Sequence, residues 1–373
     1  MSGKLSKNQA KKAGEFLAKC VNPFGEEASF ARSVVDEWRE AHKEVFLEAP
    51  ETLKDISYSI DSQAVVVGRL KRMDTIVGKL RRPGLNMKLN EMCDIVGCRV
   101  IASDIEAVRQ ISAAIENRLN VKPETGVKDY IAHPKLNGYR STHVISRHDA
   151  PEAGLTNLFC ETQVRTRLQH AWATALETYD VMSRNTLKFG GGSEKEKRLF
   201  VLISNAFAIE EGSPLVPETP AFRGELRREI ASLNNELFAI EKLRACSDSV
   251  TIVPRRGNFS GDALCLMVID HEIQKTDLFV YDTVDEVEAN QMYAKSERMK
   301  KGLQDVLLVR VASLKALNEA YPNYSMDTLV SLPRSMSSFM RVVKSADELF
   351  RRSLTWRCVN GCVAQCWLVS GVG

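Results

Sequence analysis

The sequence predicts an α+β protein in which a mixed β-sheet is flanked by helices and a smaller C-terminal α+β domain follows. Helical and strand-like patterns alternate along residues 28–182, which favours a sheet with helices packed on it. A second group of apolar, strand-like runs begins after the proline-rich stretch SPLVPETP at 213–220. We therefore expect one domain over residues 1–245 and a second over 246–373.

The order of elements follows from local patterns. Apolar residues at helical spacing predict helices, short apolar runs rich in β-branched residues predict strands, and Asp104 is expected to cap the helix that follows it. The expected N-terminal elements are helices over 28–60 and 62–82, a strand over 94–102, a helix over 105–119, strands over 141–147 and 158–165, a helix over 165–182, a helix opening at 190–197 and a helix over 222–244. The expected C-terminal elements are the strands VTIVP, ALCLMVID, DLFVYD and DVLLVRV and a helix near 284–302.

Composition is that of an ordinary globular protein, with 44% apolar residues, 27% charged residues and a net charge of +3. Such a small net charge predicts no global attraction to nucleic acid, although a local basic site remains compatible with it. The N-terminus is polar and the chain has no long apolar run. We expect neither a signal peptide nor a membrane partner, and a cytoplasmic location.

Three polar residues, Lys71, Thr75 and Lys79, are spaced to lie on one side of the expected helix over 62–82. A row of this kind is typical of a solvated basic face. It is also suited to neutralising the phosphates of a nucleotide. Spacing alone leaves both interpretations open.

Two acidic residues, Asp94 and Glu161, fall in expected strands whose other residues are mostly apolar. They could be unrelated surface acids, but a carboxylate at the end of a buried strand requires a partner. Mg²⁺ bridging phosphate groups is one such partner. Glu161 could also act as a base toward a hydroxyl nucleophile.

The loop DYIAHPKLNGYRSTH at 129–143 places Tyr139 between Lys135 and Arg140. An aromatic ring flanked by cations can stack on a nucleobase and bind its phosphates. A structural loop with one buried tyrosine is the alternative.

Four motifs follow one another along the chain: R-x-K-x-x-x-T-x-x-x-K at 69–79, D-I-x-G-x-R at 94–99, D-Y-I-x-x-P-K-x-N-G-Y-R-S-x-H at 129–143 and E-x-Q-V-R-T-x-x-x-x-A-W-A at 161–173. Taken together and in this order, they resemble the synthetase domain of the RelA/SpoT family of alarmone synthetases. The resemblance implies transfer of pyrophosphate from ATP to a ribose 3′-hydroxyl.

The resemblance also implies roles for individual residues. It implies that Asp94 and Glu161 are catalytic and hold Mg²⁺, Glu161 also being the candidate base. The residues implied to bind ATP are Arg69, Lys71 and Lys79, at the phosphates, and Arg99, at the adenine. The residues implied to bind the acceptor are Tyr139, by stacking, and Lys135, Asn137, Arg140 and His143.

A further motif, Y-x-x-Y at Tyr321 and Tyr324, resembles the fused toxin–antitoxin synthetases called CapRel. That resemblance implies autoinhibition by the C-terminal domain, which a phage protein such as a major capsid protein would release. It implies that the acceptor is the 3′-terminal adenosine of tRNA. Two other hypotheses stand beside this one: synthesis of (p)ppGpp from ATP and GDP or GTP, and a catalytically inactive nucleotide or RNA sensor.

Overall fold

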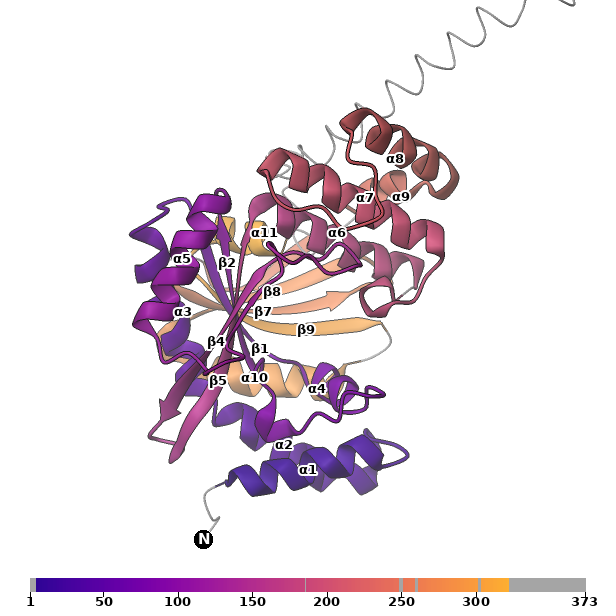
Figure 1. The fold of residues 1–373 in the computed structure, drawn as a ribbon. Helices are drawn as coiled ribbons and strands as arrows, with labels where there is room; N and C mark the ends of the chain where they lie inside the picture. The colour runs from indigo at the N-terminus through magenta and orange to yellow at the C-terminus, as the bar shows by residue number, and fades with distance from the viewer. Residues whose placement is uncertain (1–4, 185, 248–250, 259–260, 301–302, 322–373) are drawn as a thin grey trace, which may run out of the picture.

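The computed structural model describes residues 5–184, 186–247, 251–258, 261–300 and 303–321. These residues form a mixed sheet in the order β3-β4-β5-β2-β1-β9-β7-β8-β6, in which β2–β5 and β6–β8 pair in parallel and the other neighbours are antiparallel (Figure 1). The strands are β1 Val65–Leu70, β2 Val96–Ala102, β3 Val127–Asp129, β4 Thr142–Ala150, β5 Leu155–Thr166, β6 Thr251–Arg256, β7 Ala263–Asp270, β8 Lys275–Asp282 and β9 Gln304–Val311. The predicted fold class, a mixed sheet flanked by helices, is confirmed.

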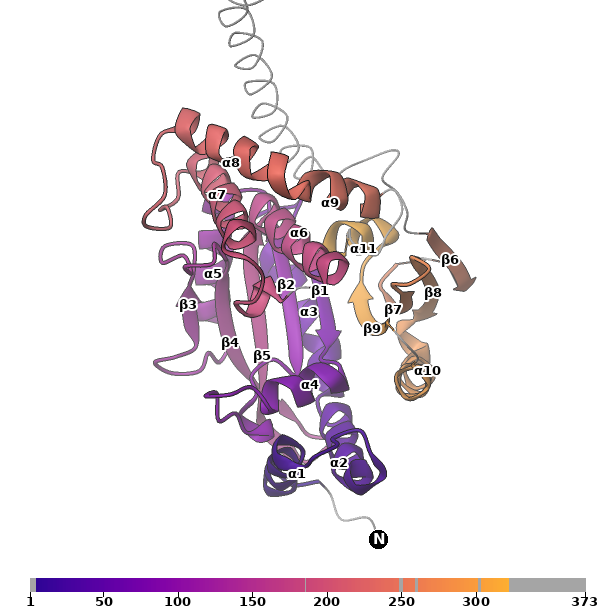
Figure 2. The same cartoon turned by 90° about the vertical axis from the view of Figure 1, so that its right-hand side faces the viewer.

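The helices are α1 Lys7–Lys19, α2 Ser29–Glu40, α3 Lys43–Tyr58, α4 Met73–Leu80, α5 Ile105–Arg118, α6 Arg167–Ser183, α7 Glu194–Glu211, α8 Arg223–Leu237, α9 Ala239–Ser247, α10 Glu286–Met299 and α11 Leu314–Ala320. One face of the sheet shares an apolar core with α3, α5 and α10, and the other face packs against α11. Helices α6 to α9 form a separate core at the end of the molecule away from α1 and α2 (Figures 1 and 2).

Strand β1 lies in the middle of the sheet and is buried on both faces. Val65 and Val67 belong to the core that includes α11, whereas Val66 belongs to the opposite core. Side chains alternate between the faces of a strand, so a strand covered on both sides can be apolar at every position.

The expected helix over 62–82 is therefore wrong in its first half. Residues 65–70 are the strand β1, and only α4, from Met73 to Leu80, is helical. Three consecutive β-branched valines favour the strand. Two other expected helices are divided: 28–60 into α2 and α3, and 222–244 into α8 and α9, where Phe238 has a φ of 50°.

The strands after residue 245 extend the N-terminal sheet. Strand β9 pairs with β1 through Gly68↔Arg310 and Arg69↔Val309, and β7, β8 and β6 follow it. The predicted boundary between 1–245 and 246–373 stays a prediction, but the hydrogen-bonded sheet is continuous across it. No helix in the described part of the chain is long and apolar enough to cross a bilayer.

Candidate active site

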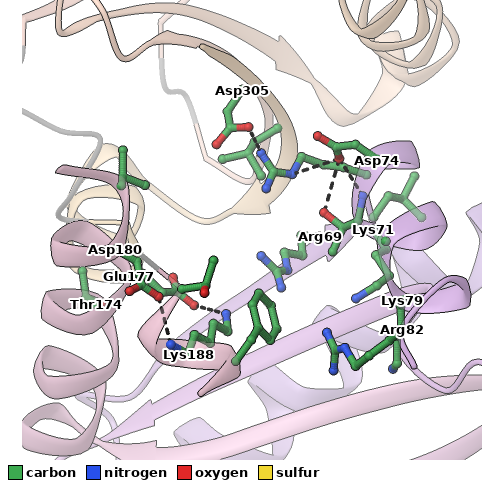
Figure 3. Close-up of a pocket in the computed structure, with 18 of the residues that line it drawn as sticks. Arg69, Lys71, Asp74, Lys79, Arg82, Thr174, Glu177, Asp180, Lys188 and Asp305 are labelled. Atoms are coloured by element: carbon green, nitrogen blue, oxygen red, sulfur yellow. Dashed lines mark hydrogen bonds and ion pairs between the residues drawn. The ribbon is translucent and has the colours of Figure 1, made fainter. Parts of the chain in front are cut away.

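A cavity of about 720 Å³ opens where β1 ends and α4 begins. The predicted ATP-binding residues Arg69, Lys71, Lys79 and Arg99 all line it. Lys71 lies between β1 and α4, so it reaches the cavity from the strand end and not from the helix face that we expected. Across the cavity from Arg69, Lys79 and Arg82, the carboxylates of Glu177 and Asp180 project from α6 (Figure 3).

A second cavity, of about 240 Å³, adjoins the first. Four of the five predicted acceptor-binding residues line it: Lys135, Asn137, Tyr139 and His143. The residues that line both cavities are Arg69, Arg82, Arg99, Glu177, Lys188 and Phe189. The two predicted ligand sites are thus neighbours with a largely cationic wall in common.

Asp94 lies just before β2 and binds two ammonium groups at once. Its Oδ2 accepts from Nζ of Lys71 at 2.7 Å, and its Oδ1 accepts from Nζ of Lys79 at 2.9 Å. Burial by itself would raise the pKa of Asp94, but the two lysines outweigh it and lower that pKa to about 2. Asp94 is therefore ionised at neutral pH and tied to both lysines of the predicted phosphate row.

Glu161 lies on β5 beside Gly97 of β2 and ends a chain of hydrogen bonds from the smaller cavity. In the tautomer of His143 that carries its proton on Nδ1, this Nδ1 donates to Oε1 of Glu161 at 3.3 Å. Nε2 of the same ring then accepts from the hydroxyl of Tyr139 at 2.8 Å. Burial opposes ionisation of Glu161, but His143 outweighs it, so the pKa of Glu161 is lowered. Glu161 is therefore ionised at neutral pH.

The loop that carries Tyr139 is anchored from behind. Gly138 has a φ of 90°, and a Cβ there would lie 3.0 Å from atoms of Trp172 and Ser204, so the turn requires glycine. Arg140 donates to Ser204 Oγ at 3.0 Å, to Asn205 Oδ1 at 3.0 Å and to the carbonyl of Pro214 at 2.6 Å. Arg140 is among the lining residues of neither cavity, so its contacts assign it to anchoring the loop on α7.

Lys135 lies over two tyrosine rings at the smaller cavity. Its Nζ lies 4.2 Å from the ring centroid of Tyr130 and 5.0 Å from that of Tyr139. Asn137 Oδ1 accepts a hydrogen bond from the Tyr139 backbone N–H at 3.1 Å, which fixes the turn before the ring. Both contacts hold Tyr139 at the wall of the smaller cavity.

The end of α11 reaches the shared wall from the C-terminal part of the chain. Arg99 donates to the Ala320 carbonyl at 3.0 Å, and its guanidinium lies 5.7 Å from the ring centroid of Tyr321. His170 accepts at Nδ1 from Arg165 at 2.7 Å and donates from Nε2 to the Glu319 carbonyl at 2.8 Å. Tyr321 thus meets the arginine predicted to stack on adenine. Tyr324 lies outside the described residues.

Our sequence reasoning did not single out Glu177, Lys188 and Phe189 on the shared wall. Glu177 pairs with Lys188 at 2.5 Å, and Arg82 lies 4.5 Å from the ring centroid of Phe189. Glu177 follows His170 by seven residues and therefore lies on the same side of α6, which is a signal that helical spacing could have supplied. Lys188 and Phe189 form a short turn after the helix, and no sequence pattern marks them.

The part of the chain that carries these residues is similar in sequence to known proteins. Residues 68–179, which contain all four motifs, match the family described as "Region found in RelA / SpoT proteins". GTP pyrophosphokinase YwaC of Bacillus subtilis (strain 168) is 35% identical over 114 residues, or 28% of this chain and 52% of that protein. GTP pyrophosphokinase YjbM of the same strain is 27% identical over 176 residues, or 46% of this chain and 77% of that protein. The chain thus spans about half the length of YwaC.

Among solved structures, small alarmone synthetase 1 from Bacillus subtilis is 26% identical, with a TM-score of 0.39 over 48% of this chain and 93% of that chain. The family match and the sequence relatives together show that this chain contains the region found in RelA/SpoT proteins and is homologous to GTP pyrophosphokinases. The predicted resemblance is confirmed to that extent. The CapRel-like fusion stays a prediction.

Proposed function

We propose that the protein is a pyrophosphokinase that moves a pyrophosphate group from ATP to the 3′-hydroxyl of a nucleotide acceptor. One observation carries the proposal: a larger cavity with a cationic row and a smaller cavity with Tyr139 share a wall that contains Arg69 and Arg99. ATP in the larger cavity and the acceptor in the smaller one would meet at this wall. The named relatives, which are GTP pyrophosphokinases, support the same reaction class.

In this reaction the acceptor 3′-oxygen forms a bond to the β-phosphorus of ATP. The bond between that phosphorus and the oxygen bridging to the α-phosphorus breaks, AMP leaves, and the hydroxyl proton is lost to a base or to solvent. Positioning and neutralisation of phosphate charge dominate catalysis of such transfers. The row Arg69, Lys71 and Lys79 would supply the neutralising charge.

We expect Asp94 and Glu161 to hold Mg²⁺, the cofactor that their chemistry fits. Both pKa values are lowered, and Glu161 lies near enough for the charge of Asp94 to act on it. No cluster of three or more His, Cys, Asp or Glu side chains forms a metal site in the described residues, so phosphate oxygens and water would complete the coordination. Bound Mg²⁺ would neutralise charge on the transferred phosphates. Each oxygen of Asp94 accepts from one lysine and keeps a second lone pair that a cation could use.

For the acceptor, we propose the 3′-terminal adenosine of tRNA, whose modification would block aminoacylation and stop translation. The Y-x-x-Y resemblance to the CapRel group supports this choice. The alternative acceptor is GDP or GTP, giving (p)ppGpp, and the names of the relatives favour it. Tyr139 does not separate the two, because every base offers a face for stacking.

We further propose that the C-terminal part of the chain holds the enzyme inactive until a phage protein, such as a major capsid protein, binds it. The contacts of Arg99 with Ala320 and Tyr321 support this, since they occupy the guanidinium that adenine would stack on. The hydrogen bond from His170 to the Glu319 carbonyl gives the same segment a second attachment. Release of this segment would free Arg99 for ATP.

Label transfer tests the reaction. The full chain carrying Tyr321→Ala, the substitution expected to relieve the proposed inhibition, is incubated with γ-³²P-ATP and Mg²⁺ together with either bulk tRNA or GDP, and the label is followed. We expect label in tRNA, and its loss in Glu161→Gln. Label confined to guanosine nucleotides would favour GDP or GTP as the acceptor. The absence of label from both acceptors would contradict the proposed reaction.

A tyrosine substitution tests the inhibition. Tyr321→Ala should make expression of the full chain more toxic to its host and should raise the rate of label transfer. Tyr58→Ala is the control, because that tyrosine is 43% exposed and lines neither cavity. Equal behaviour of the two variants would contradict autoinhibition by this segment.

A further inference from the structure

Helix α4, which carries Thr75 and Lys79, caps only part of its own first turn: Oδ1 of Asp74 accepts from the backbone N–H of Thr75 at 2.7 Å. The residue before it, Arg72, makes no side-chain capping hydrogen bond. The first backbone N–H groups of a helix have no partner within the helix and must find one elsewhere. Here a partner comes from α10: Oε1 of Glu297 accepts from the backbone N–H of Met73 at 3.2 Å, across 224 positions of sequence.

Glu297 is itself held firmly. Its Oε2 pairs with Nη1 of Arg39 on α2 at 2.7 Å, and its Oε1 accepts from the hydroxyl of Tyr293 at 3.1 Å. Arg39 and Tyr293 are buried, and the guanidinium lies 4.9 Å from the ring centroid. A carboxylate with three partners from three helices has little freedom to leave the start of α4.

The neighbours of Met73 are bound by the same part of the chain. Lys300 pairs with Asp74 at 2.8 Å, and Asp305 of β9 pairs with Arg72. Residues 72, 73 and 74 are thus each attached to the C-terminal segment. Arg72, Asp74 and Asp305 also line the larger cavity, so these attachments lie at its edge.

Such attachments matter because α4 is short. Helices of eight residues are marginal in water on their own, and a carboxylate at the N-terminus stabilises them through the unpaired N–H groups and the helix dipole. The position of α4 fixes Lys79, which together with Lys71 binds Asp94. Disturbing the start of α4 therefore disturbs the cationic row.

We propose that Glu297 is a positioning residue for the larger cavity: it caps α4 from the C-terminal part of the chain and so sets the affinity of the cavity for ATP. The inference rests on the proposed function in taking ATP as the ligand. It gives α10 and β9 a supporting role at the site, distinct from the inhibiting role proposed for the end of α11.

The test uses the full chain with Tyr321→Ala as parent, so that the proposed inhibition does not mask binding. Glu297→Ala removes the cap, and Glu297→Gln keeps an oxygen that can accept from Met73. Glu286→Ala is the matched control, because Glu286 lies on the same helix and pairs with Lys43 at 3.2 Å without touching α4. Amide hydrogen exchange of residues 72–82 and the Kd for ATP with Mg²⁺ are measured in all four proteins.

We expect Glu297→Ala to speed exchange of α4 amides and to raise the Kd for ATP, each by about fivefold, the size of a lost helix cap. Glu297→Gln should recover most of both effects, and Glu286→Ala should stay within about twofold of the parent, as for a partly exposed ion pair. Unchanged α4 exchange in Glu297→Ala, or an equal effect of Glu286→Ala, would overturn the inference. If the parent binds no ATP, the proposed function fails, while the exchange data still decide whether Glu297 caps α4.

Discussion

Asp94 sits between two ammonium groups, and this arrangement determines how the site should respond to acid. In the folded chain the pKa of Asp94 is lowered from 3.8 to about 2, although burial acts in the opposite direction. A group whose pKa is lower in the folded state stabilises the fold above its unfolded pKa. That stabilisation is lost as the pH falls through the folded pKa.

We therefore predict that Asp94→Asn lowers the free energy of unfolding by on the order of 2 kcal/mol above about pH 4, and that the deficit shrinks as the pH falls toward about 2. Urea unfolding at a series of pH values measures this difference. Asp55→Asn serves as control, because Asp55 is exposed on α3. A deficit that stays constant from neutral pH to pH 2 would contradict the ion-paired state of Asp94.

The candidate catalytic and binding residues could be picked out from the sequence because each stands out chemically from its surroundings. Asp94 and Glu161 interrupt apolar runs, and Tyr139 lies between two cations. Hydrogen bonds from side chains to distant backbone carbonyls could not be predicted from the sequence. The contacts of Arg99 and His170 with the carbonyls of Ala320 and Glu319 involve atoms that every residue has, so no side-chain pattern announces them.

At the scale of elements, the sequence predicted β2, α5, β4, β5 and α6 in their order, because half-buried elements display their periods clearly, but it missed the three-residue strand β3. It failed at β1, because a strand buried on both faces has no alternation to detect and its last residue, Leu70, happens to continue the helical spacing of α4. Helix α11 escaped prediction because seven residues offer too little periodicity.

The packing of α3 on β1 yields a prediction at the same scale. A Cβ added to Gly68 would lie 2.5 Å from Cγ of Pro50, whose rigid ring sits inside α3 and cannot turn away. Gly68→Ala should therefore lower the free energy of unfolding by roughly 1–3 kcal/mol, the usual cost of overpacking.

A second glycine provides the control. Gly78 lies inside α4, and a Cβ there would meet no heavy atom within 4 Å. Gly78→Ala should stabilise the chain by about 0.5–1 kcal/mol, since alanine is the better helix former. Chemical denaturation measures the change in the free energy of unfolding for each variant, and we expect a decrease for Gly68→Ala and an increase for Gly78→Ala. An unchanged free energy of unfolding in Gly68→Ala would argue against the close contact between α3 and β1.

At the scale of the whole molecule, the N-terminal and C-terminal parts share one sheet and the apolar cores on both of its faces. Val65, Val67 and Ile101 pack against Leu307 and Val309 on the face that α11 covers. Ion pairs such as Arg39–Glu297 join the same parts on the other face. The end of α11, which is proposed to inhibit the site, thus belongs to a part of the chain that also supports the site.

This arrangement predicts that a chain ending at residue 245 is unstable and not simply uninhibited. Without β9 the edge of β1 and the apolar side chains on it become exposed, at roughly 1.5–3 kcal/mol for each large aliphatic side chain uncovered. Several such losses approach the entire stability of an ordinary domain, about 5–15 kcal/mol.

We expect the chain 1–245 to aggregate or to unfold at a lower urea concentration than the full chain. The chain 1–321, which keeps β6 to β9 and α11, should unfold at a higher urea concentration than the chain 1–245. Size-exclusion chromatography and urea unfolding of the three proteins make the comparison. A chain 1–245 that is monomeric and unfolds at the full chain's urea midpoint would contradict this prediction. The N-terminal part would then be an independent domain whose fold does not depend on β9.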